Sequence, residues 1–506
     1  MLFNSIGFIF LFLPIVVAVF FWFGRFNRNY AAAWLAAVSI FFYGYWDYRY
    51  LILLGGSIIF NYWGGLRIGH ANGSIRKYWL VFTIATDLLL LAYYKYADFF
   101  ISSLNDIAGA GIPLLNIALP IGISFFTFTQ IAFLVDSYQG KVKEYRFIHY
   151  VLFITYFPHL IAGPVLHHRE MMPQFAEKNT YAASAVNVAV GLSIFIIGLA
   201  KKVLIADSIA PIANGVFSPG SHPQLIESWI GVLAYTFQLY FDFSGYSDMA
   251  IGLSRMFGIR LPLNFNSPYK AGNISEFWRR WHMTLSRFLR DYLYIPLGGN
   301  REGLIDRYRN LMITMLLGGL WHGAGWTYVV WGGLHGLYLV INHIWQRFMY
   351  RRAWQAGYVY SIASKFLTFA AVSFAWIFFR SPNFSTAADV IGGLIGNNGI
   401  SLPTLGKPYA ELFINMGIQP VFDGIRWIDA GAMSVLVVSI LLVWFIPNTQ
   451  EIFRRFEPCL EKVEEATDCP RLIWRPSLRW SLGLALLFCV CILSLNRPSE
   501  FLYFQF

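Results

Sequence analysis

Hydrophobic residues occur in long blocks that short polar segments separate along the whole chain. Blocks of this length are typical of helices that cross or enter a lipid bilayer, because about 20 apolar residues span its hydrocarbon core. Some blocks are short enough to be re-entrant, so we expect roughly 11 to 13 true crossings. The blocks lie near residues 2–23, 30–46, 49–66, 78–97, 117–135, 147–166, 185–200, 229–253, 311–329, 330–346, 363–379, 432–447 and 480–495.

Basic residues alternate between successive connections. They occur at 25–28, 67–77 and 141–146, whereas the intervening connections at 47–49 and 98–112 are neutral or acidic. By the positive-inside rule, the basic connections face the cytoplasm and the N-terminus lies outside. The net charge of +11 is therefore typical of a membrane protein with basic inner loops, and we expect no nucleic-acid partner.

The alternation becomes ambiguous in the middle of the chain. Lys201 and Lys202 indicate an inner position, yet the very basic segment 255–310 must also be inside. A short or re-entrant passage through residues 203–217 would reconcile the two.

Further along the chain, we predict an external loop at 381–431, where basic residues are few, and a cytoplasmic loop at 451–479. No internal repeat and no flexible linker divides the chain, so we expect a single membrane domain over residues 1–506.

Composition supports the membrane assignment. Hydrophobic residues make up 57% and charged residues only 13% of the chain, far from the balance of a soluble protein. The segment Leu2–Phe23 has no basic leading region and no cleavage site of small residues, so we expect it to remain as a membrane helix. The four cysteines form no C-x-x-C pair, and we expect neither a disulfide framework nor a metal site.

His322 is the most informative single residue, because it is the only acidic or basic side chain between Leu311 and Val330. A polar side chain at bilayer depth is costly, and it usually faces a protein interior or a water-filled cavity. A histidine there can accept and return a proton near neutral pH. Glycines around it allow close approach of backbone or ligand: Gly318, Gly319, Gly323 and Gly325.

The segment 235–250 carries polar residues within an apolar block. Gln238 and Asp242 are four residues apart and would share one helical face, and Asp248 follows. These groups either line a polar cavity or form an internal hydrogen-bond network that holds helices together, and the sequence leaves both interpretations open.

Residues 276–300 mix tryptophans with four arginines and predict an amphipathic helix at the inner membrane interface, with His282 within it. The arginines could bind the phosphates of an anionic donor, or they could extend to lipid headgroups. Earlier in the chain, two prolines and a glycine surround His159 and predict a broken or re-entrant element at 156–164, with a functional or an architectural role. We expect His335 to serve packing or support.

Three motifs together resemble the membrane-bound O-acyltransferase family, in particular its bacterial branch that acetylates exported polysaccharides. They are Phe-Trp-Arg-Arg-Trp-His at 277–282, Leu-Arg-Asp-Tyr-Leu-Tyr-Ile-Pro-Leu-Gly-Gly-Asn at 289–300 and Gly-Gly-Leu-Trp-His-Gly-Ala at 318–324. The resemblance covers most of the chain and is weakest at 381–431. It implies an all-α polytopic fold, in which a ring of tilted helices with re-entrant and interfacial helices surrounds a central tunnel.

The resemblance also implies roles for particular residues. His322 matches the catalytic histidine of the family, and His282 matches its second active-site polar position. The donor would be acetyl-coenzyme A, a substrate and not a bound cofactor, held near Trp278 and the four arginines, Arg279, Arg280, Arg287 and Arg290. Residues that would line or support the tunnel are Gln238, Asp242, His159, Trp321 and Asn300.

The implied activity is transfer of acetyl groups from cytoplasmic acetyl-coenzyme A across the bacterial inner membrane to an alginate- or cellulose-type polysaccharide. A periplasmic protein with an SGNH-hydrolase-like fold would accept or relay the acetyl group, beside a polysaccharide secretion complex and membrane lipid. A peptidoglycan O-acetyltransferase subunit is one alternative. Others are a transporter or channel with a proton path through His322, Asp242 and His159, and a scaffold that only docks secretion proteins.

Overall fold

Helices are the only regular elements in the part of the chain that the computed structural model describes. Helices satisfy their backbone hydrogen bonds internally, which a bilayer interior requires, and the all-α prediction is confirmed. The described residues are 1–142, 146–161, 163–301, 303–349, 357–400, 411, 414, 426–462, 472–496 and 502.

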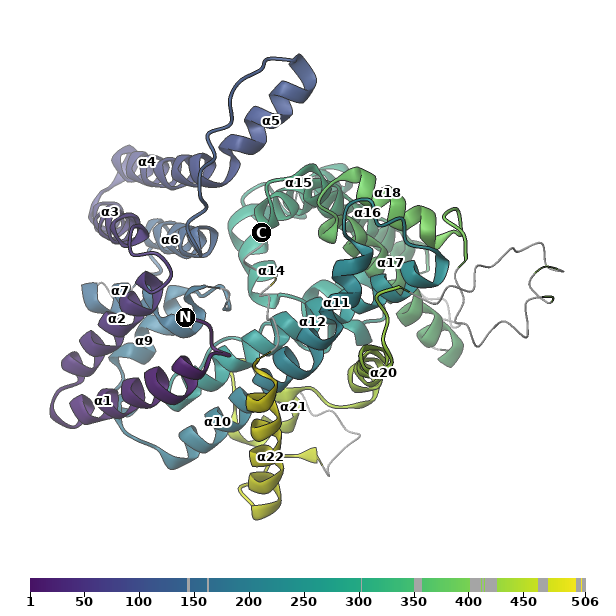
Figure 1. Cartoon of the computed structure of the whole chain (residues 1–506). Helices are drawn as coiled ribbons and strands as arrows, with labels where there is room; N and C mark the ends of the chain where they lie inside the picture. The colour runs from purple at the N-terminus through teal and green to yellow at the C-terminus, as the bar shows by residue number, and fades with distance from the viewer. Residues whose placement is uncertain are drawn as a thin grey trace.

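Each apolar block predicted from the sequence contains a helix (Figure 1). The first half forms α1 (Leu13–Phe26), α2 (Arg28–Gly44), α3 (Tyr50–His70), α4 (Gly73–Leu91), α5 (Ala97–Ala108), α6 (Ile123–Tyr138), α7 (Phe147–Thr155), α8 (Phe157–Leu160), α9 (His168–Ala176), α10 (Ala185–Ala200), α11 (Asp207–Val216) and α12 (Leu225–Met256). The second half forms α13 (Ile274–Arg280), α14 (Met283–Leu289), α15 (Leu304–His322), α16 (Trp326–Phe348), α17 (Tyr358–Arg380), α18 (Phe384–Leu394), α20 (Ala430–Phe445), α21 (Thr449–Ile452) and α22 (Leu478–Ser494).

Five helical stretches among the described residues are long and apolar enough to cross a membrane, and α20 and α22 are apolar but shorter. The remaining helices are shorter or more polar, so the number of crossings stays a prediction. The five stretches are Phe8–Phe26, Tyr50–His70, Gly73–Ala108, Ala185–Val216 and Tyr358–Arg380.

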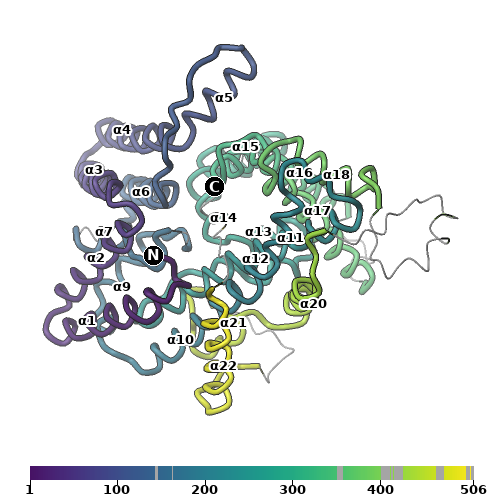
Figure 2. Tube along the Cα trace, viewed as in Figure 1, coloured from purple at the N-terminus to yellow at the C-terminus, as the bar shows by residue number. Residues whose placement is uncertain are grey.

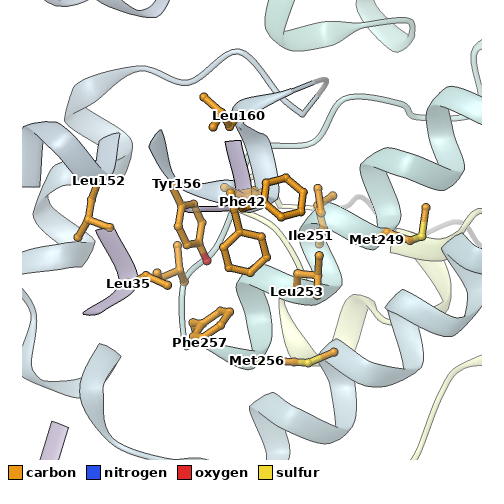
Figure 3. Close-up of a cluster of buried hydrophobic side chains, with 14 of the residues drawn as sticks. Leu35, Phe42, Leu152, Tyr156, Leu160, Met249, Ile251, Leu253, Met256 and Phe257 are labelled. Carbon is orange, nitrogen blue, oxygen red and sulfur yellow. The ribbon is translucent and has the colours of Figure 1, made fainter. Parts of the chain in front are cut away.

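The long helix α12 runs through the middle of the molecule and joins two hydrophobic cores (Figure 1). Its C-terminal half packs with α1, α2, α7 and α10, and Figure 3 shows Phe42, Tyr156 and Phe257 meeting in this core. Its N-terminal half packs with α11, α16, α17 and α20. The arm formed by α5 projects away from this body (Figure 2).

The passage predicted at 203–217 is not a separate element. Helix α10 continues through the π-helical turn η4 (Lys201–Ala206) directly into α11, so residues 185–216 form one helical run. Lys201 and Lys202 do not belong to a loop, because they pair with Asp248 and Asp242 on α12. The prediction was wrong because the sequence does not distinguish a lysine that forms an ion pair with another helix from a lysine in a loop.

The break predicted at 156–164 is confirmed. Helix α7 ends at Thr155, Tyr156 leaves the helical region with φ −49° and ψ 107°, and α8 begins directly after it. Pro158 occupies the first turn of α8, where its missing N–H costs no hydrogen bond.

The single amphipathic helix predicted at 276–300 is wrong. The structure has α13, α14 and a π-helical turn η6 (Arg290–Tyr294) instead. Trp281 is extended and His282 has a φ of +43°, in the left-handed region that few residues other than glycine adopt. His282 therefore lies at the break between α13 and α14 and not on a helical face.

Several elements with basic residues meet on one face. Arg28 donates to the last carbonyl of α9, Arg76 donates to a carbonyl near the end of α6, and α9 meets α14 through Glu170 and Arg287. This clustering agrees with the alternation of basic connections in the sequence.

The described part of the predicted external loop 381–431 contains α18, which packs on the start of α12 through the indole of Trp229 and the carbonyl of Leu394. Most of 401–425 lies outside the described residues. The predicted cytoplasmic loop 451–479 contains the end of α21 and a 3-10 turn at Arg454–Phe456, while 463–471 lies outside the described residues.

Candidate active site

Two histidines that the sequence separates by 40 residues meet where α6, α14 and α15 converge. The ring centroids of His282 and His322 are 6.2 Å apart, and their side chains are 1% and 6% exposed. A small core of α6, α14 and Trp321 holds this region, with the ring of Phe128 stacked between Phe288 and Trp321. The pairing that the family resemblance implies is therefore present in the fold.

His322 is the last residue of α15. The helix ends there because Gly323 and Gly325 are extended, and a side chain at Gly323 would collide with the ring of Tyr328. Around the imidazole, Trp331 and Phe379 pack edge-on at centroid distances of 5.1 and 5.2 Å. These rings limit the orientations available to His322 and exclude water from one side of it.

Asn264 orients His282. The Nδ1 atom of His282 lies 3.0 Å from the Oδ1 atom of Asn264, which also accepts a 2.9 Å hydrogen bond from the hydroxyl of Thr284. A carboxamide oxygen only accepts hydrogen bonds, so we assign the proton of the neutral ring to Nδ1 and the acceptor lone pair to Nε2. Sequence reasoning missed Asn264, although a polar residue between Leu263 and Phe265 was a signal.

A lysine that sequence reasoning also missed lies beside His322. Lys95 belongs to the π-helical turn η2 (Ala92–Tyr96), and its ammonium donates to the carbonyl oxygen of Trp321. Lys95 and His322 line the same cavity of about 90 Å³, together with Ser124. The available signal was a lysine inside an apolar block, where a charge is costly.

A second cavity adjoins the first. It has a volume of about 270 Å³, and Lys95 and Leu119 line both. Its wall also contains Asp98 at the start of α5, Gly323 directly after α15, and Tyr328 in the first turn of α16. The two cavities together give His322 a route toward the face opposite to the basic one.

On the basic face, a cavity of about 330 Å³ is lined by four of the five residues predicted to bind the donor, Trp278, Arg279, Arg287 and Arg290. Thr284, the hydrogen-bond partner of Asn264, lines it as well. The cavity therefore reaches the residues that hold His282.

The arginines differ in their partners. Arg287 forms two 2.8 Å hydrogen bonds to the carboxylate of Glu170. The fifth predicted residue, Arg280, does not line the cavity and pairs instead with Glu276 at 2.8 Å. Glu461 lines the cavity, and burial raises the pKa of its carboxyl, although the N–H of Leu263 opposes the shift.

The predicted supporting residues occupy different places. Trp321 lines the cavity of His322, and its ring lies 4.9 Å from that of His322. Gln238 and Asp242 are buried on α12 and line none of these three cavities, and Asp242 pairs with Lys202 at 2.7 Å.

Three predicted residues remain, His159, Asn300 and His335, and none of them lines the cavity of His322 or the basic cavity. His159 sits in the core of α12 and α2, where its Nε2 atom lies 3.0 Å from the carbonyl of Phe153. Asn300 is exposed and accepts a hydrogen bond from Tyr294. His335 packs beside the site and accepts a hydrogen bond from the indole of Trp278.

The arrangement combines a proton acceptor, a cation and two separate approaches. The imidazole of His322 can take a proton from a small nucleophile in its cavity. The basic cavity can bind an anionic molecule from the opposite side. Such a site suits transfer of a small group between two molecules that arrive from opposite faces.

Comparison with known proteins supports the motif-based resemblance over the whole chain. Residues 75–379, which include both histidines, match the model of the membrane-bound O-acyltransferase family, MBOAT. A Pseudomonas aeruginosa protein named probable alginate O-acetylase AlgI is 45% identical over 551 residues, covering 100% of both chains. A Helicobacter pylori peptidoglycan O-acetyltransferase is 39% identical over 538 residues, covering 100% of this chain and 98% of that protein. A Bacillus subtilis teichoic acid D-alanyltransferase is 27% identical over 281 residues, covering 54% and 71%.

Proposed function

Because the chain belongs to the membrane-bound O-acyltransferase family, we propose that it transfers acetyl groups from cytoplasmic acetyl-coenzyme A for the O-acetylation of an exported polysaccharide. It is a multi-pass membrane acyltransferase. One observation carries the proposal: His282 and His322 form a buried pair, with a basic cavity that reaches the residues holding His282 and a separate cavity at His322.

Acetyl-coenzyme A would bind in the basic cavity. Arginine side chains suit its phosphates, since a guanidinium forms charge-assisted, often bidentate hydrogen bonds to phosphate oxygens. Arg279 is the strongest candidate, because Arg287 already binds the carboxylate of Glu170 and Arg290 that of Asp291. The thioester end would point along Thr284 toward His282 and His322.

The transfer would place the acceptor hydroxyl in the cavity of His322. The hydroxyl oxygen attacks the acetyl carbonyl carbon while the imidazole takes its proton; the carbon–sulfur bond then breaks, and His322 returns the proton to the coenzyme A thiolate. A variant route first moves the acetyl group to the imidazole, and the hydroxyl then attacks that acetyl-imidazole. General-base catalysis supplies roughly 10²–10⁴ in rate, so positioning supplies the rest.

His282 would position the reactants. With its Nδ1 proton donated to Asn264, the neutral ring offers only an acceptor at Nε2. That tautomer suits holding a hydroxyl or relaying a proton, and it cannot donate to an oxyanion.

The acceptor side is proposed from the relatives. A full-length relative is named for alginate and another for peptidoglycan, so an alginate-type polymer is the first candidate and peptidoglycan the second. An SGNH-hydrolase-like protein on the periplasmic side would receive or relay the acetyl group, with this chain in the bacterial inner membrane and its N-terminus outside.

The test uses the full chain reconstituted in lipid nanodiscs with acetyl-coenzyme A labelled in the acetyl group. We expect His322→Ala to lower transfer and coupled thiol release by about 10²-fold or more. His159→Gln is the matched control, because it changes another buried histidine while glutamine can still reach the carbonyl of Phe153. Unchanged transfer by His322→Ala would refute the proposed role.

Two further measurements separate the alternatives. Uptake of labelled solutes into proteoliposomes without acetyl transfer would favour a transporter. Acetate on alginate and on muropeptides, compared between cells with and without this protein, identifies the polymer, and loss of acetate from only one of them decides between the two candidates.

A further inference from the structure

Lys95 is a charged residue beside His322 that the transfer described above does not use. It lies in η2, a single π-helical turn within the candidate membrane span Gly73–Ala108. Single π turns inside α-helices are frequent at functional sites. A charged side chain within a membrane span is costly and marks a functional role by default.

A structural role alone requires no charge. Lys95 and Tyr96 donate to the carbonyl oxygens of Trp321 and Leu320, which lie in the last turn of α15 and lack partners within the helix. Both side chains therefore cap α15, and Tyr96 does so at 2.9 Å with a neutral hydroxyl.

The charge of Lys95 also lacks the carboxylate partner that two other lysines within helical runs have. Lys201 pairs with Asp248, and Lys202 pairs with Asp242. Within the described ranges, the polar partners of the Lys95 ammonium are the carbonyl of Trp321 and, at 3.4 Å, the hydroxyl of Ser124, and no carboxylate lies within ion-pair distance.

The acidic residue that shares the outer cavity with Lys95 is already engaged. The carboxylate of Asp98 accepts hydrogen bonds from the backbone of Leu115 and Ile117. Asp98 does not line the small cavity of His322, so the ammonium of Lys95 makes that cavity electropositive, and a developing negative charge there would be stabilised.

We propose that Lys95 stabilises the negative charge that develops on the acetyl carbonyl oxygen during transfer, an inference that rests on the proposed function. When the hydroxyl oxygen bonds to the carbonyl carbon, the π electron pair moves onto the carbonyl oxygen, and the Lys95 ammonium donates a hydrogen bond to it. The C=O bond reforms as the carbon–sulfur bond breaks. Lys95 keeps its proton throughout, and His322 carries the proton from the hydroxyl to the thiolate.

The size of the site agrees with this role. At about 90 Å³, the cavity that Lys95 and His322 share is the smallest of the three cavities around the histidine pair. That space suits an acyl carbonyl and an attacking hydroxyl, and it is too small for the nucleotide part of the donor. His282 in its assigned tautomer does not supply the hydrogen-bond donor that the oxygen requires.

The first test compares Lys95→Gln with Tyr96→Phe in nanodiscs. Glutamine keeps a polar N–H but has no charge, whereas Tyr96→Phe removes the neighbouring cap and keeps the ammonium. We expect Lys95→Gln to lower kcat about 10²-fold, because a neutral amide stabilises a developing negative charge much less than an ammonium does, with KM for acetyl-coenzyme A nearly unchanged. Tyr96→Phe should leave kcat close to the starting value.

Rescue of activity by added amines provides a second test, because a purely structural role of Lys95 would not make the rate depend on the amine. Methylammonium or ethylammonium chloride should raise the rate of Lys95→Ala in a concentration-dependent way, whereas ethanol should not. Thermal unfolding of each variant verifies the fold, and Lys95→Met replaces the glutamine variant if that one does not fold.

The outcomes separate this inference from the proposed function. If His322→Ala is inactive while an uncharged Lys95 variant keeps its kcat, or if amines give no rescue, the role of Lys95 is wrong and the transfer proposal stands. If His322→Ala remains active, the proposed function itself fails.

Discussion

Asn264 decides how His282 presents its ring, because its side-chain oxygen binds both the Nδ1 atom of His282 and the hydroxyl of Thr284. Loss of this oxygen would leave a buried imidazole able to rotate and change tautomer.

We therefore expect Asn264→Ala to lower kcat for acetyl transfer by roughly 10-fold to 100-fold, the usual cost of removing a group that orients a functional histidine. Asn266→Ala is the control, because Asn266 contacts Asn448 and not the histidine pair. Steady-state kinetics in nanodiscs checks both variants, and equal kcat values for the two would contradict this role of Asn264.

At the scale of elements, helix α13 places its two adjacent arginines in different surroundings. Arg279 faces the basic cavity, whereas Arg280, the next residue, is held by Glu276 one turn earlier.

Arg279→Gln should raise KM for acetyl-coenzyme A by about tenfold, because loss of one charge-assisted hydrogen bond costs about 1.5 kcal/mol or more, and each 1.4 kcal/mol is a factor of ten. kcat should change little, since Arg279 is far from the reacting bond in the proposed binding mode. Arg280→Gln should leave KM unchanged, and the reverse pattern would place the phosphates elsewhere.

Helices α15 and α16 approach each other closely enough to require glycine. A side chain at Gly332 would collide with the carbonyl of Met315 on α15, whereas at Gly333 it would make an ordinary contact with Leu316. This contact fixes the end of α15, where His322 lies.

We expect Gly332→Ala to lower the free energy of unfolding by about 1–3 kcal/mol, as overpacking does, and to reduce transfer because α15 must shift. Gly333→Ala adds the same methyl group one residue later and should behave like the unmodified protein. Thermal unfolding in detergent together with the transfer assay tests the pair, and similar melting temperatures for the two variants would be evidence against the tight contact.

Across the whole molecule, buried ion pairs tie α10 and α11 to α12. Lys202 lies within 2.6 Å of Asp207 and 2.7 Å of Asp242, and all three side chains are buried. Asp242 also accepts a hydrogen bond from the backbone of Leu502, so this network reaches the far end of the chain.

Lys202→Met should lower the free energy of unfolding by about 3–5 kcal/mol, because it leaves two carboxylates without their cation. The triple variant with Asp207→Asn and Asp242→Asn removes both uncompensated charges and should regain part of the loss. Melting temperature and folded yield in detergent measure this, and a single variant as stable as the unmodified protein would show that the network contributes little.

The sequence alone determined that each apolar block contains a helix, and it singled out His322 as the most informative histidine. Hydropathy and block length are local properties, and a bilayer permits only helices in a chain of this pattern. A lone histidine in an apolar block was visible for the same reason. The sequence also predicted a break at Tyr156, because proline acts on its immediate neighbours.

Only the tertiary structure decided which polar groups meet. Lys95 and Trp321 are 226 positions apart, and Glu170 and Arg287 are 117 apart, so no local pattern could pair them. The same limit explains two errors. Lys202 pairs with a residue on another helix and does not lie in the expected loop, and His282 lies at a left-handed backbone break and not within the expected helix. Local hydropathy determines where helices form. Whether a charge can be buried depends on partners far away in the sequence, which only the folded chain brings close enough to offset the cost of desolvation.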